Sequence, residues 1–385
     1  MKAIIIGGGI GGACAAIALQ RSGISTEVYE AVKVIKPVGA AISIWPNGVK
    51  CLNALGMAAP LRALAGNMAS MAYRDHLYGS ELTRFSMAPL VDAVGERPCP
   101  VARAELQAML LDTYGRERVQ FGKRVARVAQ DAHGVTAWFE DGSSATGDLL
   151  IAADGTHSVV RAEVLGYPTP RRYAGYVNWN GLVTIDEQIA PADQWTTFVG
   201  EGKRVSLMPV SGNRFYFFFD VPLPKGLVED RDSLRADLSR YFSGWAEPVQ
   251  RLIAQIDPNT TNRVEIHDIE PFSQLVSGRI ALLGDAAHST TPDIGQGGCA
   301  AMEDAIVLAH CLQNQAASVA QRLEHYQEQR VGRVKDLVLK ARKRCDITHG
   351  KDPLQTQAWY QSLARETGEH VLAGMIETIN GGPLN

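Results

Sequence analysis

A stretch near the C-terminal end of the chain could bind a polar ligand. The apolar segment Ile280–Leu283 is followed by Gly284 and Asp285, and a proline then leads into the glycine-rich stretch Gly295–Gly298. We expect a helix to begin near Cys299. One carboxylate and several unshielded backbone N–H groups would then meet at the start of a helix, where the helix dipole favours an anionic or polar group.

A second nucleotide-type pattern lies at the N-terminus. Gly7–Gly12 satisfies G-x-G-x-x-G between an expected strand, Ala3–Ile6, and an expected helix, Ala13–Ser22. Glu30 ends the next expected strand, which starts at Thr26, and its carboxylate can accept hydrogen bonds from both hydroxyls of a ribose. This βαβ context predicts dinucleotide binding. Because the two patterns stand far apart in the chain, we expect one large ligand held by both.

A third pattern follows the apolar segment Leu149–Ala152. Asp154, Gly155, Ser158 and Arg161 place an acid, a turn and a potential helix cap in one short stretch. Alone, the pattern is equally consistent with a capped helix start that carries a surface arginine. A nicotinamide-dependent dehydrogenase usually completes its parallel sheet and then adds a catalytic domain. Here a glycine-rich helix start comes late in the chain, which favours FAD as the bound dinucleotide.

The three patterns, with Glu303-Asp304-Ala305 after the last, resemble the single-component FAD-dependent aromatic hydroxylases, the group A flavoprotein monooxygenases. The resemblance covers roughly residues 1–345. It implies an α/β fold like that of para-hydroxybenzoate hydroxylase: a Rossmann-like FAD-binding domain with a parallel sheet, an inserted mixed or antiparallel substrate sheet, and C-terminal helices. We expect the FAD-binding domain at 1–72, 98–170 and 271–345, the substrate domain at 73–97 and 171–270, and a helical tail at 346–385.

The resemblance also implies roles for individual cofactor residues. Glu30 would hold the adenosine ribose, Arg103 the flavin phosphates or ribityl chain, and Asp285 a ribityl hydroxyl. Asp154 would serve both FAD and NAD(P)H. Members of the family often carry Asn where this chain has Cys299, so only its backbone is given a role. The full set expected to bind FAD is Gly7, Gly9, Gly11, Gly12, Glu30, Ala31, Ser43, Arg103, Val125, Asp154, Asp285, Gly295, Gln296, Gly297, Gly298 and Cys299.

The segment from Tyr173 to Val221 alternates in polarity and predicts an antiparallel sheet. One face of this sheet is uniformly apolar. The other mixes polar and apolar side chains, as a ligand pocket does, although a solvated face would also fit. The candidate substrate-binding residues are Asn178, Arg204, Tyr216, Phe217 and Phe218, with Arg204 and Tyr216 as the catalytic pair. Alternation puts Phe217 on the face opposite Tyr216 and Phe218.

An Arg, an Asn amide and a Tyr hydroxyl suit a planar, anionic, multiply hydrogen-bonding ring. By itself the pattern supports only a polar aromatic or heteroaromatic substrate. The chain is similar, within the family, to members that hydroxylate urate. This implies conversion of urate to 5-hydroxyisourate with FAD, NADH and O2, through a hydroperoxide at flavin C4a, with Arg204 steadying the negative charge. Many relatives carry Arg at the position of Asn180, which hints at a different ligand charge pattern.

Two alternatives remain open from the sequence. The first is a hydroxylase of a phenolic or N-heteroaromatic acid of the salicylate, hydroxybenzoate or 6-hydroxynicotinate type, whose carboxylate could also use Arg204. The second is a flavin-binding redox sensor without turnover. An aromatic sheet able to close a pocket argues against the second alternative.

Composition excludes several classes of protein. The 385 residues are 46% hydrophobic and 21% charged with a net charge of −3, which gives no bulk attraction to nucleic acid or to an anionic membrane. The six cysteines show no metal-ligand spacing and suit a reducing cytoplasm. We expect no metal site and no membrane span; nothing specifies the oligomeric state. His288 is expected to pack, and the basic run Lys340–Arg344 to be a solvated helix face.

Two secondary-structure expectations are tested below. Val119–Val128 reads as one strand, and residues 299–346 read as one long helical stretch. The tail beyond Pro353 is expected to be mostly helical.

Overall fold

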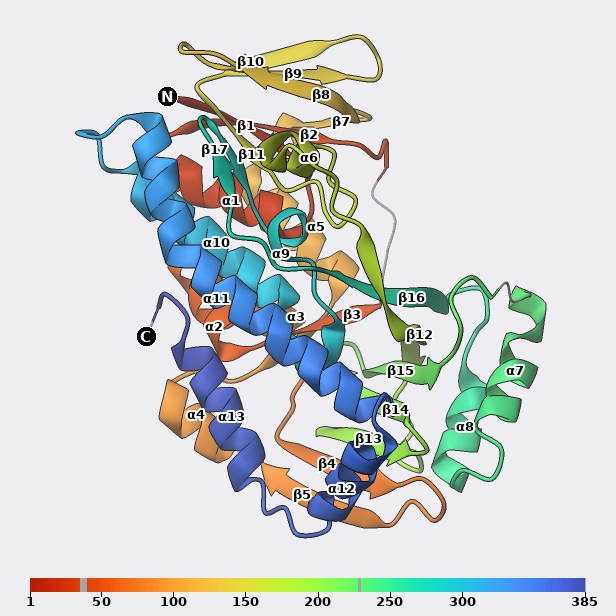
Figure 1. Ribbon diagram of the computed structural model, residues 1–385. Helices are drawn as coiled ribbons and strands as arrows, with labels where there is room; N and C mark the ends of the chain where they lie inside the picture. The colour runs from red at the N-terminus through yellow and green to blue at the C-terminus, as the bar shows by residue number, and fades with distance from the viewer. Residues whose placement is uncertain (35–39, 228–229, 385) are drawn as a thin grey trace.

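Two β-sheets organise the molecule, and the long helix α11 (Val319–Thr348) runs past both (Figure 1). The computed structural model describes residues 1–34, 40–227 and 230–384. The six-stranded sheet has the order β17 (Val276–Ser277), β18 (Ile280–Leu282), β11 (Leu149–Ala152), β1 (Lys2–Ile6), β2 (Ser25–Glu30) and β7 (Val119–Phe121). All neighbouring pairs are parallel except β17–β18. This is the Rossmann-like half of the expected α/β fold.

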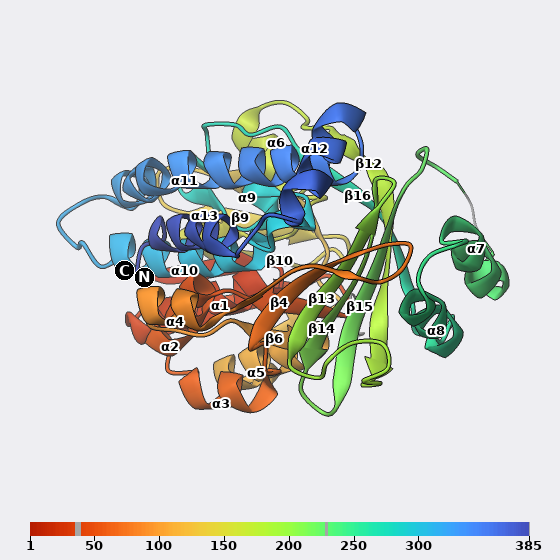
Figure 2. The ribbon, with the colours of Figure 1, turned by 90° about the horizontal axis from the view of Figure 1, so that it is seen from below.

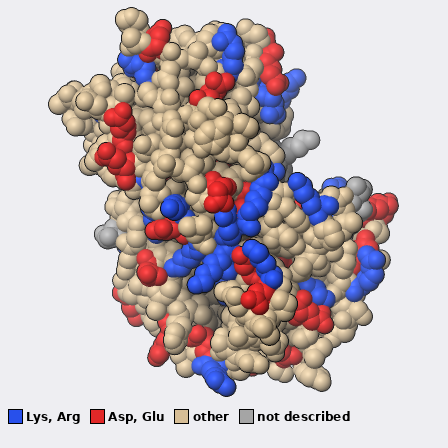
Figure 3. Space-filling model, viewed as in Figure 1, with Lys and Arg blue, Asp and Glu red and all other residues tan. Residues whose placement is uncertain are grey.

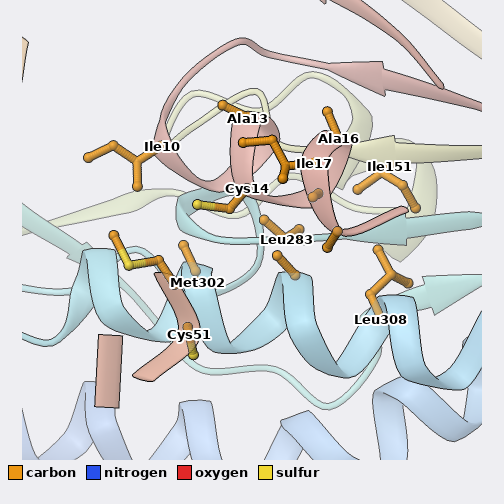
Figure 4. Packing of buried hydrophobic residues seen from close by; sticks show 14 of the residues in the cluster. Ile10, Ala13, Cys14, Ala16, Ile17, Cys51, Ile151, Leu283, Met302 and Leu308 are labelled. Atoms are coloured by element: carbon orange, nitrogen blue, oxygen red, sulfur yellow. The ribbon is translucent and has the colours of Figure 1, made fainter. Parts of the chain in front are cut away.

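Helix α1 (Ile10–Arg21) lies against helix α10 (Gly297–Leu312), which joins the two ends of the sequence in one core (Figure 4). Small side chains make the close approach possible. A Cβ added at Gly11 would lie 2.8 Å from Leu283, and Ala13 and Cys14 are fully buried. Gly7 has φ +104°, and a Cβ there would overlap the carbonyl oxygen of Ala153. The turn after β1 therefore requires glycine.

The seven-stranded sheet provides the second half of the fold. Its order is β16 (Asn262–Ile269), β12 (Arg171–Thr184), β15 (Arg214–Pro222), β14 (Lys203–Val210), β13 (Gln194–Gly200), β4 (Ser70–Asp75) and β5 (Glu81–Ser86). Neighbours are antiparallel except β13–β4. Two expected domain boundaries, after residues 72 and 345, fall inside β4 and α11.

Helices α7 (Leu234–Tyr241) and α8 (Glu247–Gln255) cover one face of this sheet, on the side away from the Rossmann-like half (Figure 2). The side chains between them form one apolar cluster that includes Trp179, Phe217, Phe219 and Phe242. Phe217 is only 1% exposed. The expectation that its side chain binds substrate is therefore wrong, because the strand alternation turns it toward α7 and α8.

The expected strand at 119–128 and the expected helix at 299–346 are each interrupted. Gly122, with φ +75°, separates β7 from β8 (Val125–Gln130). β8 then joins β9 (Val135–Phe139) and β10 (Ser144–Gly147) in a separate three-stranded sheet. The helical stretch divides into α10 and α11, because Ser318 starts a new helix with a capping box to Gln321. Local periodicity does not reveal such breaks when the residues on both sides favour the same conformation.

The basic run Lys340–Arg344 is not simply a solvated face. Lys340 donates to Thr378 on the tail helix α13 (Glu369–Asn380), and Arg342 binds the buried carboxylate of Asp268 at 2.9 Å. Arg344 lies over the ring of Trp359 on helix α12 (Pro353–Leu363). On the surface seen in Figure 3, Lys and Arg side chains gather near the middle, mixed with acidic ones. The contacts of Lys340 and Arg344 attach the helical tail to α11, and that of Arg342 attaches α11 to β16.

The remaining elements stand between the strands and helices already described. They are β3 (Ala41–Ile44), β6 (Cys99–Ala102), α2 (Pro46–Ala54), α3 (Ala58–Leu64), α4 (Ala88–Val94), α5 (Arg103–Tyr114), α6 (Val160–Leu165), α9 (Asp285–His288) and the 3-10 turns η1 (Arg116–Arg118), η2 (Arg231–Ser233) and η3 (Pro292–Ile294). Among the described residues, no helix is both long and apolar enough to cross a membrane. Within the same ranges, no three His, Cys, Asp or Glu side chains gather as metal ligands would.

Candidate active site

The first part of the site is the turn between β1 and α1. The Glu30 carboxylate accepts hydrogen bonds from the backbone N–H of Gly8 at 2.7 Å and of Val32 at 3.0 Å. It is thereby held beside the glycine turn, next to Ala31. A Cβ added at Gly9 would meet nothing within 4 Å, so this side of the turn is open to a ligand. A Cβ at Gly12 would overlap the carbonyl oxygen of Gly7, which explains the tight start of α1.

The second part follows β11. Oδ2 of Asp154 accepts from the backbone N–H of Val159 at 3.0 Å, whereas Oδ1 is buried and has no partner among the described residues. Burial raises the pKa of Asp154, and its hydrogen bonds only partly oppose this. Arg161 is not a surface residue: it is 4% exposed and donates to the carbonyls of Thr156 at 2.8 Å and Ala286 at 3.1 Å. It ties this loop to α9.

The third part comprises α9 and the start of α10. Asp285 opens α9 with an exposed side chain. Gly295 has φ +65°, which suits glycine, and a Cβ there would press on Nε1 of Trp45. That Nε1 is buried and has no partner among the described residues. Gln296 accepts from Nδ2 of Asn47 at 2.8 Å, and Gly297 and Gly298 begin the helix.

Cys299 is a packed thiol. Burial raises its pKa to about 12, although the backbone N–H of Trp45 donates to its sulfur at 3.3 Å. A Cβ added at Gly48 would lie 2.8 Å from this sulfur. Cys299 therefore closes the contact between α2 and α10 and stays protonated at neutral pH.

A buried charge network supports the start of α10. Asp304 accepts from Gly284 at 2.9 Å, contacts Nε2 of His288 at 2.7 Å and binds Nε of Arg330 at 2.7 Å. Glu303 binds Arg330 at 3.0 Å and also Arg333. Burial would raise the pKa of Asp304, but His288 and Arg330 outweigh it and lower the pKa to about 2. His288 thus packs within this network, as expected.

Three further residues that were expected to bind the cofactor lie on other elements of the fold. Arg103 begins α5 with an exposed side chain, and its backbone N–H donates to the carbonyl of Ala40 at 3.2 Å. Oγ of Ser43, on β3, is buried without a partner among the described residues. Val125 is buried at the start of β8. No contact of Val125 with a ligand follows from this position.

These parts meet because of the sheet topology. β1, β2, β11 and β18 are parallel, so their carboxyl ends share one edge, and Gly7, Glu30, Asp154 and Asp285 follow those ends. This edge is where open α/β sheets bind ligands. The unpartnered Oδ1 of Asp154 and the open glycine turn lie along it. The arrangement fits FAD: a pyrophosphate at the turn, a ribose at Glu30, and the flavin end toward Asp285 and α10.

The mixed face of the seven-stranded sheet carries a row of three bonded side chains. Arg204, Asp220 and Asn178 are cross-strand neighbours on β14, β15 and β12. Arg204 binds Oδ2 of Asp220 at 2.7 Å, and Nδ2 of Asn178 donates to Oδ1 of Asp220 at 2.6 Å. Asp220 is fully buried. Among the described residues none accepts from Nη1 of Arg204, which leaves two donors for a ligand.

Tyr216 and Phe218 lie beside this row. No described residue bonds to the Tyr216 hydroxyl, and the ring is half-buried. Burial and the charge of Asp220 raise the pKa of Tyr216 above its usual value, so the phenol remains a neutral donor; Arg204 and Arg103 oppose this shift only in part. The Arg204 guanidinium lies 5.0 Å from the centre of the Phe218 ring. Phe218 forms an apolar wall next to the charged group.

An amide chain fixes the orientation of Asn178. Nδ2 of Asn178 donates to Asp220, a carboxylate that only accepts, so Oδ1 of Asn178 must accept the 2.7 Å bond from Nδ2 of Asn180. Oδ1 of Asn180 in turn accepts from the backbone N–H of Ala40 at 3.2 Å. Asp220 therefore sets the direction of the Asn178 amide, and Asn180 links that amide to the backbone of Ala40.

Sequence reasoning missed three residues of this region: Asp220, Asp293 and His349. Asp293, in η3, accepts from the Tyr176 hydroxyl at 3.0 Å and lies 3.4 Å from Nη2 of Arg204. Burial would raise its pKa, but His349 and Arg204 lower the pKa to about 2. Alternation from Tyr216 could have placed Asp220 on the mixed face. Nothing local points to Asp293 or His349.

Known proteins resemble this chain along its whole length. Residues 1–341 match the family model described as "FAD binding domain". The FAD-dependent urate hydroxylase of Klebsiella pneumoniae subsp. pneumoniae is 69% identical over 384 residues, covering 100% of both chains. That of Mycolicibacterium vanbaalenii is 53% identical over 386 residues, covering 100% of this chain and 98% of the relative.

A solved structure also matches the chain over its whole length. The crystal structure of Klebsiella pneumoniae HpxO complexed with FAD and uric acid is 68% identical, with a TM-score of 0.98, over 100% of this chain and 98% of that one. The chain therefore belongs to the FAD-binding-domain family, among its single-component flavoprotein monooxygenases.

Proposed function

We propose that this protein hydroxylates urate to 5-hydroxyisourate, with FAD as bound cofactor and NADH and O2 as co-substrates. The observation that carries the proposal is the mixed face of the seven-stranded sheet, where Arg204, Asn178 and Tyr216 leave donors free beside the apolar wall of Phe218. The relatives described above are urate hydroxylases, and one was solved with uric acid. Overall, one oxygen atom of O2 enters urate and the other leaves as water, while NADH supplies two electrons.

The cofactor residues proposed for this chain are those that follow the parallel strands. Glu30 binds the adenosine ribose, and the backbone of Gly7–Gly12 binds the pyrophosphate. Asp285 and the backbone of Gly295–Cys299 hold the ribityl and flavin end. Arg103, whose charge also acts on Tyr216, bridges the cofactor and substrate sides. FAD, when bound, takes electrons from NADH and activates O2.

The chain's own groups act on the substrate. Arg204 is always charged, and Asp220 and Asp293 fix its guanidinium on one side. Its free donors bind the urate anion and stabilise the negative charge on the ring as oxygen transfers. Tyr216 donates as a neutral phenol. The oriented amide of Asn178 fixes one edge of the ring, and Phe218 excludes water from the other side.

We also propose a division of the chain that follows the observed elements. The FAD-binding domain takes 1–69, 98–170 and 271–348, which keeps α11 whole. The substrate domain takes 70–97 and 171–270, which keeps β4 whole. The tail takes 349–385.

The proposal is tested with purified protein loaded with FAD. NADH and O2 are supplied with urate, xanthine, salicylate or 6-hydroxynicotinate, and NADH oxidation and substrate loss are both followed. We expect urate alone to stimulate NADH oxidation, with nearly one urate consumed per NADH. Stimulation by salicylate or 6-hydroxynicotinate, and none by urate, would contradict the proposal.

Arg204→Gln tests the role given to that residue. The variant keeps a polar side chain but removes the charge, so we expect the product formed per NADH to fall by about tenfold, with hydrogen peroxide released instead. Arg84→Gln is the matched control, because Arg84 is an exposed arginine of the same sheet. An unchanged product yield per NADH in Arg204→Gln would show that the charge is not needed.

A further inference from the structure

The end of α11 places a histidine behind the substrate face. His349 is buried, and its ring stacks on Tyr176 with 3.8 Å between centroids and 22° between planes. The Tyr176 hydroxyl donates to Oδ2 of Asp293, and Oδ1 of the same carboxylate lies 3.4 Å from Arg204. His349 therefore contacts Asp293, which in turn contacts Arg204, the residue proposed to bind urate.

Both ring nitrogens of His349 face oxygen atoms. Nδ1 lies 3.2 Å from the carbonyl oxygen of Gly202, which can only accept. Nε2 lies 3.4 Å from Oδ1 of Asp293, an ion-pair contact without the alignment of a good hydrogen bond. A neutral imidazole has one N–H, so either neutral tautomer would turn a lone pair toward an oxygen. Only the imidazolium satisfies both neighbours.

The charges around Arg204 also favour the protonated form of His349. Arg204 is one cation between two buried carboxylates, Asp220 and Asp293, so these three groups alone carry a net charge of −1. That charge would repel an anionic ring in a site of low dielectric. A protonated His349 makes the cluster neutral and leaves the free donors of Arg204 available to an anion.

The other titratable groups packed here do not supply this charge. From β12, Tyr176 is buried, and burial raises its pKa well above its usual value. From α11, burial likewise raises the pKa of the Cys345 thiol. Both are therefore neutral at physiological pH. Among the described residues, the charged side chains that ion pairs connect to His349 are Asp293, Arg204 and Asp220, from η3, β14 and β15.

We propose that His349 is a positioning residue: as an imidazolium it pairs with Asp293 and so holds Arg204 in place to receive an anionic substrate. The consequence for urate rests on the proposed function, whereas the protonation state does not. The inference also gives the end of α11, where the tail begins, a direct effect on the substrate site.

The first test needs no substrate. In FAD-loaded protein labelled with 15N-histidine, the His349 side chain is assigned through its backbone neighbours Thr348 and Gly350. We expect 15N shifts of a doubly protonated ring at pH 7. A neutral tautomer at that pH would overturn the inference, whatever the protein turns over.

The second test measures His349→Gln beside His370→Gln, a control at an exposed histidine of the same tail. We expect His349→Gln to raise KM for urate about tenfold and to lower product per NADH, with KM for NADH and FAD content unchanged. His349→Lys, which restores a cation, should recover part of the affinity.

Two outcomes separate the claims. If wild-type protein turns over urate and His349→Gln keeps both its KM for urate and its product per NADH, the positioning role is wrong and the proposed function stands. If wild-type protein does not turn over urate while the His349 ring is doubly protonated, the proposed function is wrong and the electrostatic assignment stands. Equal losses of KM for urate and for NADH in His349→Gln would indicate a merely structural role and would also overturn the inference.

Discussion

On one face of the seven-stranded sheet, Phe217 and Phe219 pack against α7 and α8 in a cluster of carbon-rich side chains. On the other face of the same strands, Arg204, Asp220 and Asn178 are also buried but are held by charge and hydrogen bonds. Neighbouring residues of β15 thus lie in two environments that are stabilised by different interactions. The apolar face needs volume and shape, and the polar face needs a partner for almost every atom.

The exceptions on the polar face are informative. Both oxygens of Asp220 accept hydrogen bonds within the sheet, whereas Nη1 of Arg204, one N–H of the Asn178 amide and the Tyr216 hydroxyl have no partner among the described residues. Unused donors in a well-paired region mark where a ligand completes the network. The apolar face is held mainly by packing and carries no charged side chain in its cluster of described residues, so the two faces should respond differently to mutation and to pH.

The largest effect is expected on the apolar face. Phe217→Ala leaves a cavity between the sheet and its two helices and should lower the free energy of unfolding by roughly 3–5 kcal/mol. KM for urate of the folded fraction should change little, because the side chain points away from the site. Denaturant unfolding followed by circular dichroism measures the first quantity, with Phe217→Leu as a milder control. A large change in KM without loss of stability would show that the two faces are not separate.

Acid should weaken the polar face selectively. The pKa of Asp293 is lowered to about 2 in the folded protein, below that of an unfolded aspartate, so its contribution is complete at neutral pH and is lost as pH falls from about 4 to about 2. The loss amounts to about 2 kcal/mol. Asp293→Asn should flatten this part of the plot of unfolding free energy against pH. Phe217→Leu should leave the slope as it is, and equal slopes in all three proteins would contradict the assignment.

The smallest effect is expected for Tyr216→Phe, which removes a single hydroxyl from the polar face of the sheet. Losing a neutral hydrogen bond costs about 0.5–1.5 kcal/mol, so KM for urate should rise by roughly 2–10-fold. The melting temperature should stay near that of the wild type, since the hydroxyl has no protein partner among the described residues. Steady-state kinetics and a thermal melt check the two halves of this expectation. A marked loss of stability would mean that the hydroxyl belongs to the fold.

Much of the cofactor half follows from local patterns. Gly7–Gly12 and Glu30 could be read as a strand–turn–helix unit because glycine at positive φ and a β-branched run each have a local cause. The expected strand Ala3–Ile6 lies within β1, and the expected helix Ala13–Ser22 overlaps α1. Arg161 was ambiguous, since its burial depends on α9, which lies more than 120 residues further along the chain.

For the substrate domain, the sequence predicted only which side chains share a face of the sheet. A period of two is a property of the extended backbone, so the sequence by itself separated Tyr216 and Phe218 from Phe217, which stands between them. Which partners meet on the polar face depended on the register of β12, β14 and β15 and on where η3 and the end of α11 pack. Asp293 and His349 reach Arg204 through contacts between segments far apart in the chain, and only the tertiary structure decides such contacts, because no local periodicity records them.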